Sequence, residues 1–118
     1  MTAQTPLADR HCSGYSRKSR PLTAEEIAEF LPQIAGWEVV TIDEIPRLRR
    51  AFSFQDFATA LAFTNAVGQM AEEEDHHPVI TTEWGKVTVY WWTHFVGGLH
   101  LNDFIAAAKT DRIYARQR

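Results

Sequence analysis

Apolar residues recur every three or four positions in three separate stretches of the chain, which is the spacing of a helix with one buried face. The first stretch follows a capping box of Thr23 and Glu26 and closes at Gly36. The second follows Ser53 and Asp56, which we interpret as another capping box, and extends to residue 75. The third begins near residue 101, and its apolar positions are Leu101, Phe104, Ile105 and Ala108.

Between these stretches lie shorter ones with the composition or alternation of β-strands. Residues 37–42 and about 48–52 form a first pair. Residues 79–84 and 86–94 form a second pair, and they meet at Gly85. Because side chains alternate along a strand, the last strand has two distinct faces. One face carries Val87, Val89, Trp91 and Thr93, and the other carries Thr88, Tyr90, Trp92 and His94.

The order of these elements is helix, two strands, helix, two strands, helix. Two hairpins with a helix returning between them predict an α+β fold, a single four-stranded antiparallel sheet with three helices packed on one face. The length of 118 residues suffices for one domain. Residues 1–20 lack apolar periodicity, so we interpret them as a flexible N-terminal arm and residues 21–118 as the domain.

Composition and charge narrow the possible classes of function. Hydrophobic residues make up 45% of the chain and charged residues 23%, as in ordinary soluble domains. The net charge of −3 gives no basic surface for direct binding of nucleic acid or of an anionic membrane. Neither a membrane-spanning run nor the apolar core of a signal peptide is present, and Cys12 has no second cysteine to pair with. We therefore expect a cytoplasmic protein.

Histidines gather where the second helix ends and the second hairpin closes. His76 and His77 stand at the corner between helix and strand, and Pro78 makes the chain extended there. His94 ends the following strand, and a hairpin turned at Gly85 returns it to the first two histidines. Imidazole transfers protons reversibly near neutral pH, so the sequence predicts a site for acid and base chemistry at this corner.

Carboxylates and aromatic residues accompany the histidines. Glu72 precedes His76 by about one helical turn, and we expect it to orient this ring. The acidic residues 72–75 lie at the end of a helix that disfavours negative charge, which calls for an explanation. Asp103 begins the last helix, and Trp84, Tyr90 and Trp92 offer walls for a flat heterocycle.

These residues together resemble the signature of the pterin-4a-carbinolamine dehydratases, over roughly residues 21–113. The matching positions are Glu72, His76, His77, Pro78, Trp84, His94 and Asp103. The resemblance implies loss of water from a 4a-hydroxytetrahydropterin to give a quinonoid dihydropterin, which recycles the pterin cofactor of aromatic amino acid hydroxylases. It also implies that no cofactor or metal takes part, and that the protein is a homo-oligomer, a dimer or a tetramer.

The resemblance also distributes roles among the matching residues. His76 and His94 would carry out acid and base catalysis, in an order that the sequence leaves open, and Glu72 would complete the catalytic set. The substrate-binding residues would be His77, Pro78, Trp84 and Asp103. His100 departs from the family pattern because relatives usually have threonine there, so we expect a weaker cap at the start of the last helix.

Less specific interpretations compete with these roles. His76 and His77 are also suited to the end of a helix, Asp103 to the start of one, and Trp84 to packing within a hairpin. Three histidines and a carboxylate resemble a zinc or iron site, although adjacent histidines diverge in an extended chain. A non-catalytic binding or assembly protein on the same fold is the alternative function, and the intact histidine set favours catalysis over it.

Overall fold

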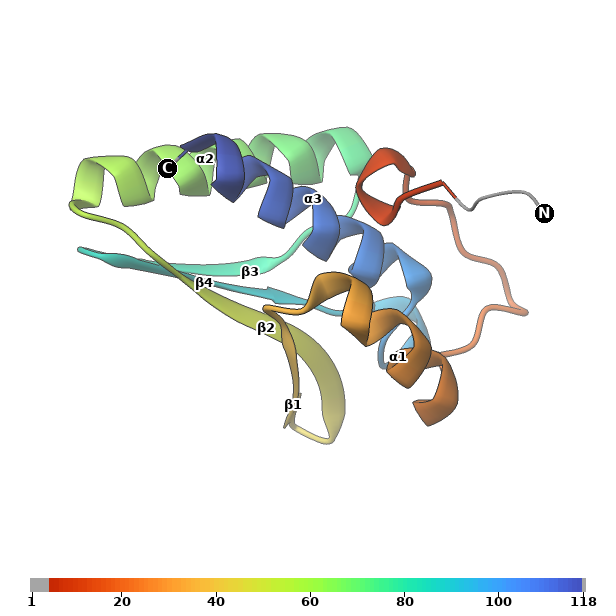
Figure 1. Cartoon of the computed structure of the whole chain (residues 1–118). Coiled ribbons are helices and arrows are strands. Elements are labelled where there is room, and N and C mark those ends of the chain that lie inside the picture. Colours follow the sequence, from red (N-terminus) through yellow and green to blue (C-terminus); the bar gives the residue numbers. More distant parts are fainter. Residues whose placement is uncertain (1–4, 118) are drawn as a thin grey trace.

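A computed structural model, which describes residues 5–117, consists of an antiparallel sheet covered by helices (Figure 1). The sheet has four strands in the order β1-β2-β4-β3, and the chain order is the predicted one. The main elements are α1 (Ala24–Phe30), β1 (Glu38–Ile42), β2 (Ile45–Ser53), α2 (Phe57–Glu74), β3 (Val79–Glu83), β4 (Lys86–Trp91) and α3 (Leu101–Gln117). Short 3-10 helices, η1 to η3, are Leu7–Asp9, Leu31–Ile34 and His94–Val96. The predicted α+β fold is confirmed.

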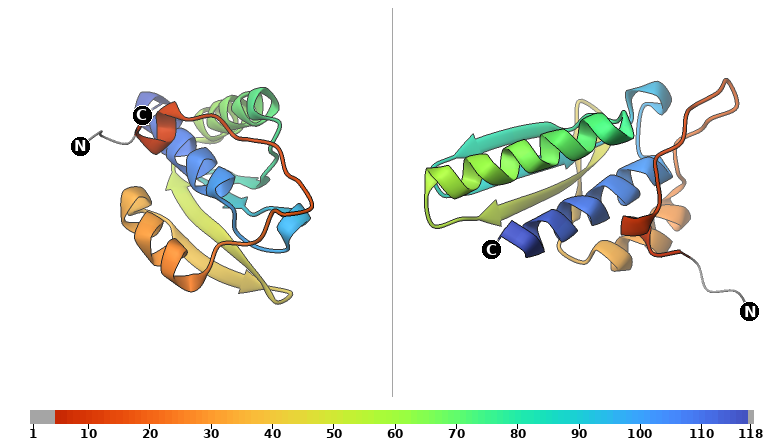
Figure 2. Two further views of the ribbon diagram at one scale, coloured as in Figure 1. Left: turned by 90° about the vertical axis from the view of Figure 1, so that its right-hand side faces the viewer. Right: turned by 90° about the horizontal axis from the view of Figure 1, so that it is seen from above.

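The three α-helices lie on one face of the sheet, and the core fills the space between them (Figure 2). Val87, Val89 and Trp91, which strand alternation places on one face of β4, are 0% exposed, so this face of the central strand is buried in the core. Leu48 of β2 pairs with Trp91, and Phe52 of the same strand pairs with Val87. Burial of these large apolar side chains drives the helices onto the sheet.

The start of α2 differs from the predicted capping box. Ser53 is the last residue of β2 and pairs with Lys86, so it cannot cap the helix. Asp56 is the N-cap instead, and its carboxylate accepts the backbone N–H of Thr59 at 2.8 Å. The interpretation of Ser53 as a cap was therefore wrong, because strand pairing continues to this residue.

Strand β4 ends at Trp91, three residues earlier than predicted. Thr93 forms an isolated antiparallel bridge with Gly98, and the chain between them folds into η3. Gly97 has a φ of 67°, a left-handed conformation that glycine adopts without strain. His94 consequently lies in a tight turn beyond the strand rather than within it.

In the described part of the N-terminal arm, η1 packs on α3, and the chain after it crosses the C-terminal end of α2 (Figure 2). Leu7 is 4% exposed, and Lys109 of α3 donates a hydrogen bond to the carbonyl of Ala8. Glu74, at the end of α2, accepts hydrogen bonds from the backbone N–H of Cys12 at 2.7 Å and from the ring of His11 at 2.8 Å. The flexibility of residues 1–20 and the boundary at residue 21 stay predictions.

The docked arm also explains one of the acidic residues at the end of α2. Burial raises the pKa of Glu74, but the hydrogen bonds from Cys12 and His11 and the charge of Lys109 outweigh it, so the pKa is lowered overall. Burial also raises the pKa of the Cys12 thiol to about 12. Glu74 is thus a charged anchor for the arm, and Cys12 stays a protonated, unreactive thiol.

Helix α3 begins with a histidine in place of the expected hydroxyl cap. His100 Nδ1 accepts the backbone N–H of Asn102 at 3.0 Å, and Asp103 in turn accepts the backbone N–H of His100 at 2.9 Å. This reciprocal pair has the logic of a capping box, with imidazole as the acceptor. Because Nδ1 must be unprotonated to accept, the cap requires neutral His100.

The cap predicts a pH dependence that a threonine would not show. Burial lowers the pKa of His100, and His76 adds to this while Asp103 opposes it. The pKa of His100 is therefore lower in the folded protein than in the unfolded chain, where it is about 6.5. The stabilisation by the cap is fully present above about pH 6.5 and is lost as the pH falls through the pKa of the folded state. The variant His100→Thr should therefore lose less thermal stability than the parent between about pH 7.5 and 5.5.

Thermal midpoints across this range would test the prediction. The two proteins are compared by how steeply the thermal midpoint changes with pH and not by its absolute value. The reason is that the substitution also removes the edge contact between the rings of His100 and Tyr15. An equal fall of the midpoint in both proteins would show that the cap does not titrate.

Candidate active site

Three histidines line one hollow of about 220 Å³ at the end of the sheet where α2 and β4 finish and α3 begins. His76, His77 and His94 come from the two sides of the β3–β4 hairpin, as the hairpin geometry predicted. The remaining wall residues are Tyr15, Asp75, Trp92, Thr93 and Phe95. The hollow is smaller than the roughly 300 Å³ of a typical ligand pocket, so a bound molecule would remain partly exposed.

The end of α2 directs the two adjacent histidines to different environments. Asp75 has a φ of 52°, a left-handed conformation, and its N–H bonds to the carbonyls of Ala71 and Glu72. Such a residue commonly ends a helix, and aspartate tolerates it better than most side chains. The chain then turns so that His76 is buried, at 8% exposed, while the side chain of His77 is 57% exposed.

His76 is held by a fully buried carboxylate. Its Nε2 lies 2.6 Å from Asp103 Oδ1, and its ring stacks on Trp91 with 5.2 Å between centroids. The other carboxylate oxygen of Asp103 accepts the hydroxyl of Thr93 and the N–H of His100, each at 2.9 Å. Because a carboxylate accepts, Nε2 of His76 is the donor and Nδ1 is left for a ligand.

Asp103 therefore acts on His76, and it is 0% exposed. The carboxylate does not line the hollow, so its position suits an orienting group and not the direct substrate contact implied by the resemblance. Its bond to the N–H of His100 confirms that it also stabilises the start of α3.

Glu72 orients His77 and not His76. Its Oε2 lies 2.5 Å from His77 Nε2, and both side chains are largely exposed. The expected pairing with His76 is wrong, because the left-handed turn at Asp75 carries His76 inward to Asp103. This exposed pair contributes little to stability, typically below about 1 kcal/mol, so its role is in the direction of the His77 ring.

His94 is exposed and begins η3. Its ring lies 5.1 Å from that of Trp92, and no hydrogen bond joins its ring to another part of residues 5–117. Trp92 is 8% exposed and has Arg47 stacked over it at 3.9 Å, which fixes the indole as a wall beside His94. Of the three predicted aromatic walls, Trp92 lines the hollow.

Trp84 and Pro78 occupy other positions. Trp84 is 69% exposed in the turn between β3 and β4. The five paired residues of β3 place this turn at the opposite end of the hairpin, roughly 17 Å from the histidines at about 3.3 Å per residue. The structure therefore does not bring Trp84 to the hollow within one chain. Pro78 precedes β3 and fixes the direction in which the strand leaves His77.

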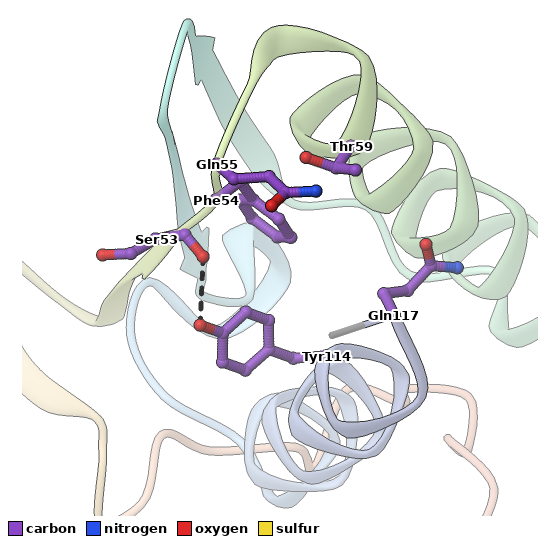
Figure 3. A pocket seen from close by; sticks show the side chains of 6 residues that line it. All are labelled: Ser53, Phe54, Gln55, Thr59, Tyr114 and Gln117. Atoms are coloured by element: carbon purple, nitrogen blue, oxygen red, sulfur yellow. Dashed lines mark hydrogen bonds between the residues drawn. The ribbon is translucent and has the colours of Figure 1, made fainter.

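A second hollow, of about 240 Å³, lies at the other end of α2 (Figure 3). Its wall consists of Ser53, Phe54, Gln55, Thr59, Tyr114 and Gln117, and the Tyr114 hydroxyl donates to the Ser53 carbonyl at 3.1 Å. This wall holds neither histidine nor carboxylate, so it lacks groups that exchange protons near neutral pH. Of these two hollows, the histidine hollow alone carries imidazole side chains.

Within residues 5–117, no three His, Cys, Asp or Glu side chains are grouped so as to hold a metal ion. No helix there is long and apolar enough to span a bilayer.

Sequence reasoning missed four residues that line the hollow: Tyr15, Asp75, Thr93 and Phe95. Thr93 was assigned only to a strand face, and the Asp75 turn was visible only as part of an acidic run. Tyr15 belongs to the arm, far from the histidines in sequence, and nothing in its surroundings signals a contact with them.

Comparisons with known proteins place this arrangement in a family. The model of the family described as pterin 4 alpha carbinolamine dehydratase matches residues 20–113. A protein of Microcystis aeruginosa, provisionally named pterin-4-alpha-carbinolamine dehydratase, is 55% identical over 96% of this chain and 97% of its own length. One of Chlorobium limicola with the same provisional name is 53% identical over 87% and 91% of the two chains.

Solved structures agree with the fold. A transcriptional coactivator/pterin dehydratase from Brucella melitensis superposes with a TM-score of 0.73 at 33% identity, over 80% of this chain and 99% of that one. A pterin dehydratase-like protein identified as a RuBisCO assembly factor of the α-carboxysome superposes at 0.57 and 22% identity, over 67% and 89% of the chains, which shows the fold alone. The family match and the close relatives together establish that this chain belongs to the pterin 4 alpha carbinolamine dehydratase family.

Proposed function

We propose that this protein dehydrates a 4a-hydroxytetrahydropterin to the quinonoid dihydropterin, and so recycles the pterin cofactor of aromatic amino acid hydroxylases in the cytoplasm. The observation that carries the proposal is the pairing of His76 with buried Asp103 at a hollow that also holds His94. Two imidazoles on one hollow match a reaction that needs one proton removed and one supplied.

His76 Nδ1 takes the proton from N5, and the electron pair of that N–H bond forms the C4a=N5 double bond. The C4a–O bond breaks, and its oxygen takes a proton from His94 and leaves as water. Asp103 holds the His76 ring and stabilises the imidazolium that forms, as a carboxylate does for the histidine of a hydrolase triad. Exposed His94 regains its proton from solvent, and His76 releases the proton on Nδ1 to water that enters the hollow after the product leaves.

His77 has a binding role in this scheme. It lines the same hollow, and Glu72 bonds to its Nε2, which leaves Nδ1 available to a ligand. The pterin ring carries hydrogen-bonding groups along its edge, which an oriented imidazole can hold without taking part in the proton transfers. Glu72 is then a positioning residue, and Pro78 fixes where His77 stands.

A non-catalytic binding or assembly role is the alternative function. Two solved structures of similar fold are described as a transcriptional coactivator/pterin dehydratase and as a RuBisCO assembly factor, the second at 22% identity. Such roles do not require a carboxylate buried behind His76, and burying a carboxylate is costly unless it serves partners. The intact His76–Asp103 pair therefore favours catalysis.

Removing either proton-transfer residue should abolish most of the turnover. We expect His76→Ala and His94→Ala each to lower kcat about 100-fold, the usual scale for one general acid or base. The double variant should lose far less kcat than the product of the two single losses, because the two residues act on one chemical step. Absorbance of a freshly generated 4a-hydroxytetrahydropterin would follow the reaction, after subtraction of the spontaneous rate.

Gln55→Ala, in the hollow that has no histidine, is the matched control and should keep parental turnover. If both histidine variants stay within about threefold of the parent, well under the roughly 1.4 kcal/mol of a tenfold change, the assignment of the pair is wrong.

A change at His77 should affect binding more than rate. We expect His77→Ala to raise KM several-fold with kcat nearly unchanged, because a group that holds the ring equally in ground and transition states contributes uniform binding. Glu72→Gln should also raise KM, but by less, because the His77 ring stays in place and loses only the charged partner of its Nε2. A fall in kcat without a change in KM would instead make His77 a catalytic residue.

We further propose that the protein is a homo-oligomer. Phe57 and Leu61 on α2 are 46% and 43% exposed, and Trp84 on the hairpin is 69% exposed. Large apolar side chains on the surface and unpaired sheet edges are commonly covered by self-association. Light scattering at micromolar concentration should give a mass at least twice the 13.5 kDa of one chain, and a monomer throughout would contradict the proposal.

A further inference from the structure

The N-terminal arm contributes an aromatic side chain to the histidine hollow. Tyr15 lines it together with His76, His77 and His94. The arm reaches this position by passing alongside η3, as both views of Figure 2 show. Among the wall residues, Tyr15 is the one that precedes α1 in the chain.

The ring of Tyr15 is held by contacts with Phe95, His100 and Asn102. It stacks on Phe95 of η3 with centroids 5.3 Å apart and an interplanar angle of 15°, and it meets His100 edge-on at 5.0 Å. Its hydroxyl accepts the side-chain N–H of Asn102 at 3.0 Å. The position of the ring is therefore set before any ligand binds, which lowers the entropic cost of a stacking contact.

Asn102 ties the arm to the helix that carries Asp103. Its amide nitrogen donates to the carbonyl of Ser13 at 2.8 Å, and its amide oxygen accepts the N–H of Ser13 at 3.0 Å. At 2% exposed, this amide has each of its hydrogen-bonding groups directed to the arm. A buried amide with these partners holds the arm in register and is costly to leave unpaired.

We propose that Tyr15 is a wall of the pterin site, against which the flat heterocycle packs while the histidines act on its edge. The inference rests on the proposed function and adds a substrate-binding residue to it. An aromatic wall suits a bicyclic ring because stacking requires no particular hydrogen-bond pattern. Since the hydroxyl is engaged by Asn102, the ring of Tyr15 and not its oxygen forms the contact.

The test compares variants of the full chain. Tyr15→Ala should raise KM about tenfold, the scale of one lost aromatic stacking contact, and leave kcat within about twofold. Tyr15→Phe should keep KM within about twofold of the parent, because the ring and its contact with Phe95 remain. Arg17→Ala, an exposed position two residues along the arm, is the matched control and should keep both parameters.

A second variant tests the route by which the arm is held. Asn102→Ala should raise KM as Tyr15→Ala does, although Tyr15 itself is intact. The double variant should be no worse than the more affected single one, because both remove the same wall. Should Asn102→Ala fail to fold, the Tyr15 variants alone decide the matter.

Failure of this inference differs from failure of the proposed function. If the parent turns over and Tyr15→Ala has parental KM, or loses kcat without KM, Tyr15 is not a wall of the site. If the parent shows no turnover, calorimetric binding of 7,8-dihydrobiopterin replaces KM. A Kd raised about tenfold by Tyr15→Ala and restored by Tyr15→Phe would then support the wall, whereas equal binding, or none by the parent, would overturn it.

Discussion

The carboxylate of Asp103 is the group on which the site depends. It is fully buried, and a buried carboxylate is tolerated when donors surround it. Those donors come from three parts of the chain: His76 after α2, Thr93 after β4 and the backbone of His100 before α3. One charge thereby joins the ends of three elements that are distant in sequence. The hollow lies where these ends meet, so the fold and the arrangement of the histidines share a single constraint.

The first turn of α3 contacts both the histidine hollow and the N-terminal arm. Asp103 faces the histidines, while its neighbour Asn102 faces the N-terminal arm. His100 links them, since its ring caps Asn102 and contacts Tyr15. A shift of this turn would move the partner of His76 and the ring of Tyr15 together. The arm is in this sense part of the architecture of the site, although it precedes the first helix of the domain.

Much of the fold follows from the sequence because periodicity reports burial directly. The inward face of β4 and the meeting of His76, His77 and His94 both derive from strand alternation and a hairpin. Side-chain partners were harder to infer. Glu72 was matched to His76 by helical spacing, yet the left-handed residue Asp75 lies between them and reverses the pairing. The left-handed conformation of Asp75 decides which carboxylate bonds to which histidine ring. This conformation is not predictable from the sequence, because the residue is not a glycine.

The docking of the N-terminal arm could not be predicted from the sequence either. Its attachment uses one buried leucine, Leu7, and hydrogen bonds between polar side chains and backbone, none of which produces a periodic pattern. The acidic residues at the end of α2 have different partners, which the structure shows and the sequence does not. Glu72 bonds to the His77 ring, and Glu74 anchors the arm. Negative charge at the end of a helix is unfavourable to the helix itself. Hydrogen bonds offset this cost in the folded protein, because Glu72 bonds to the His77 ring and Glu74 accepts from Cys12 and His11.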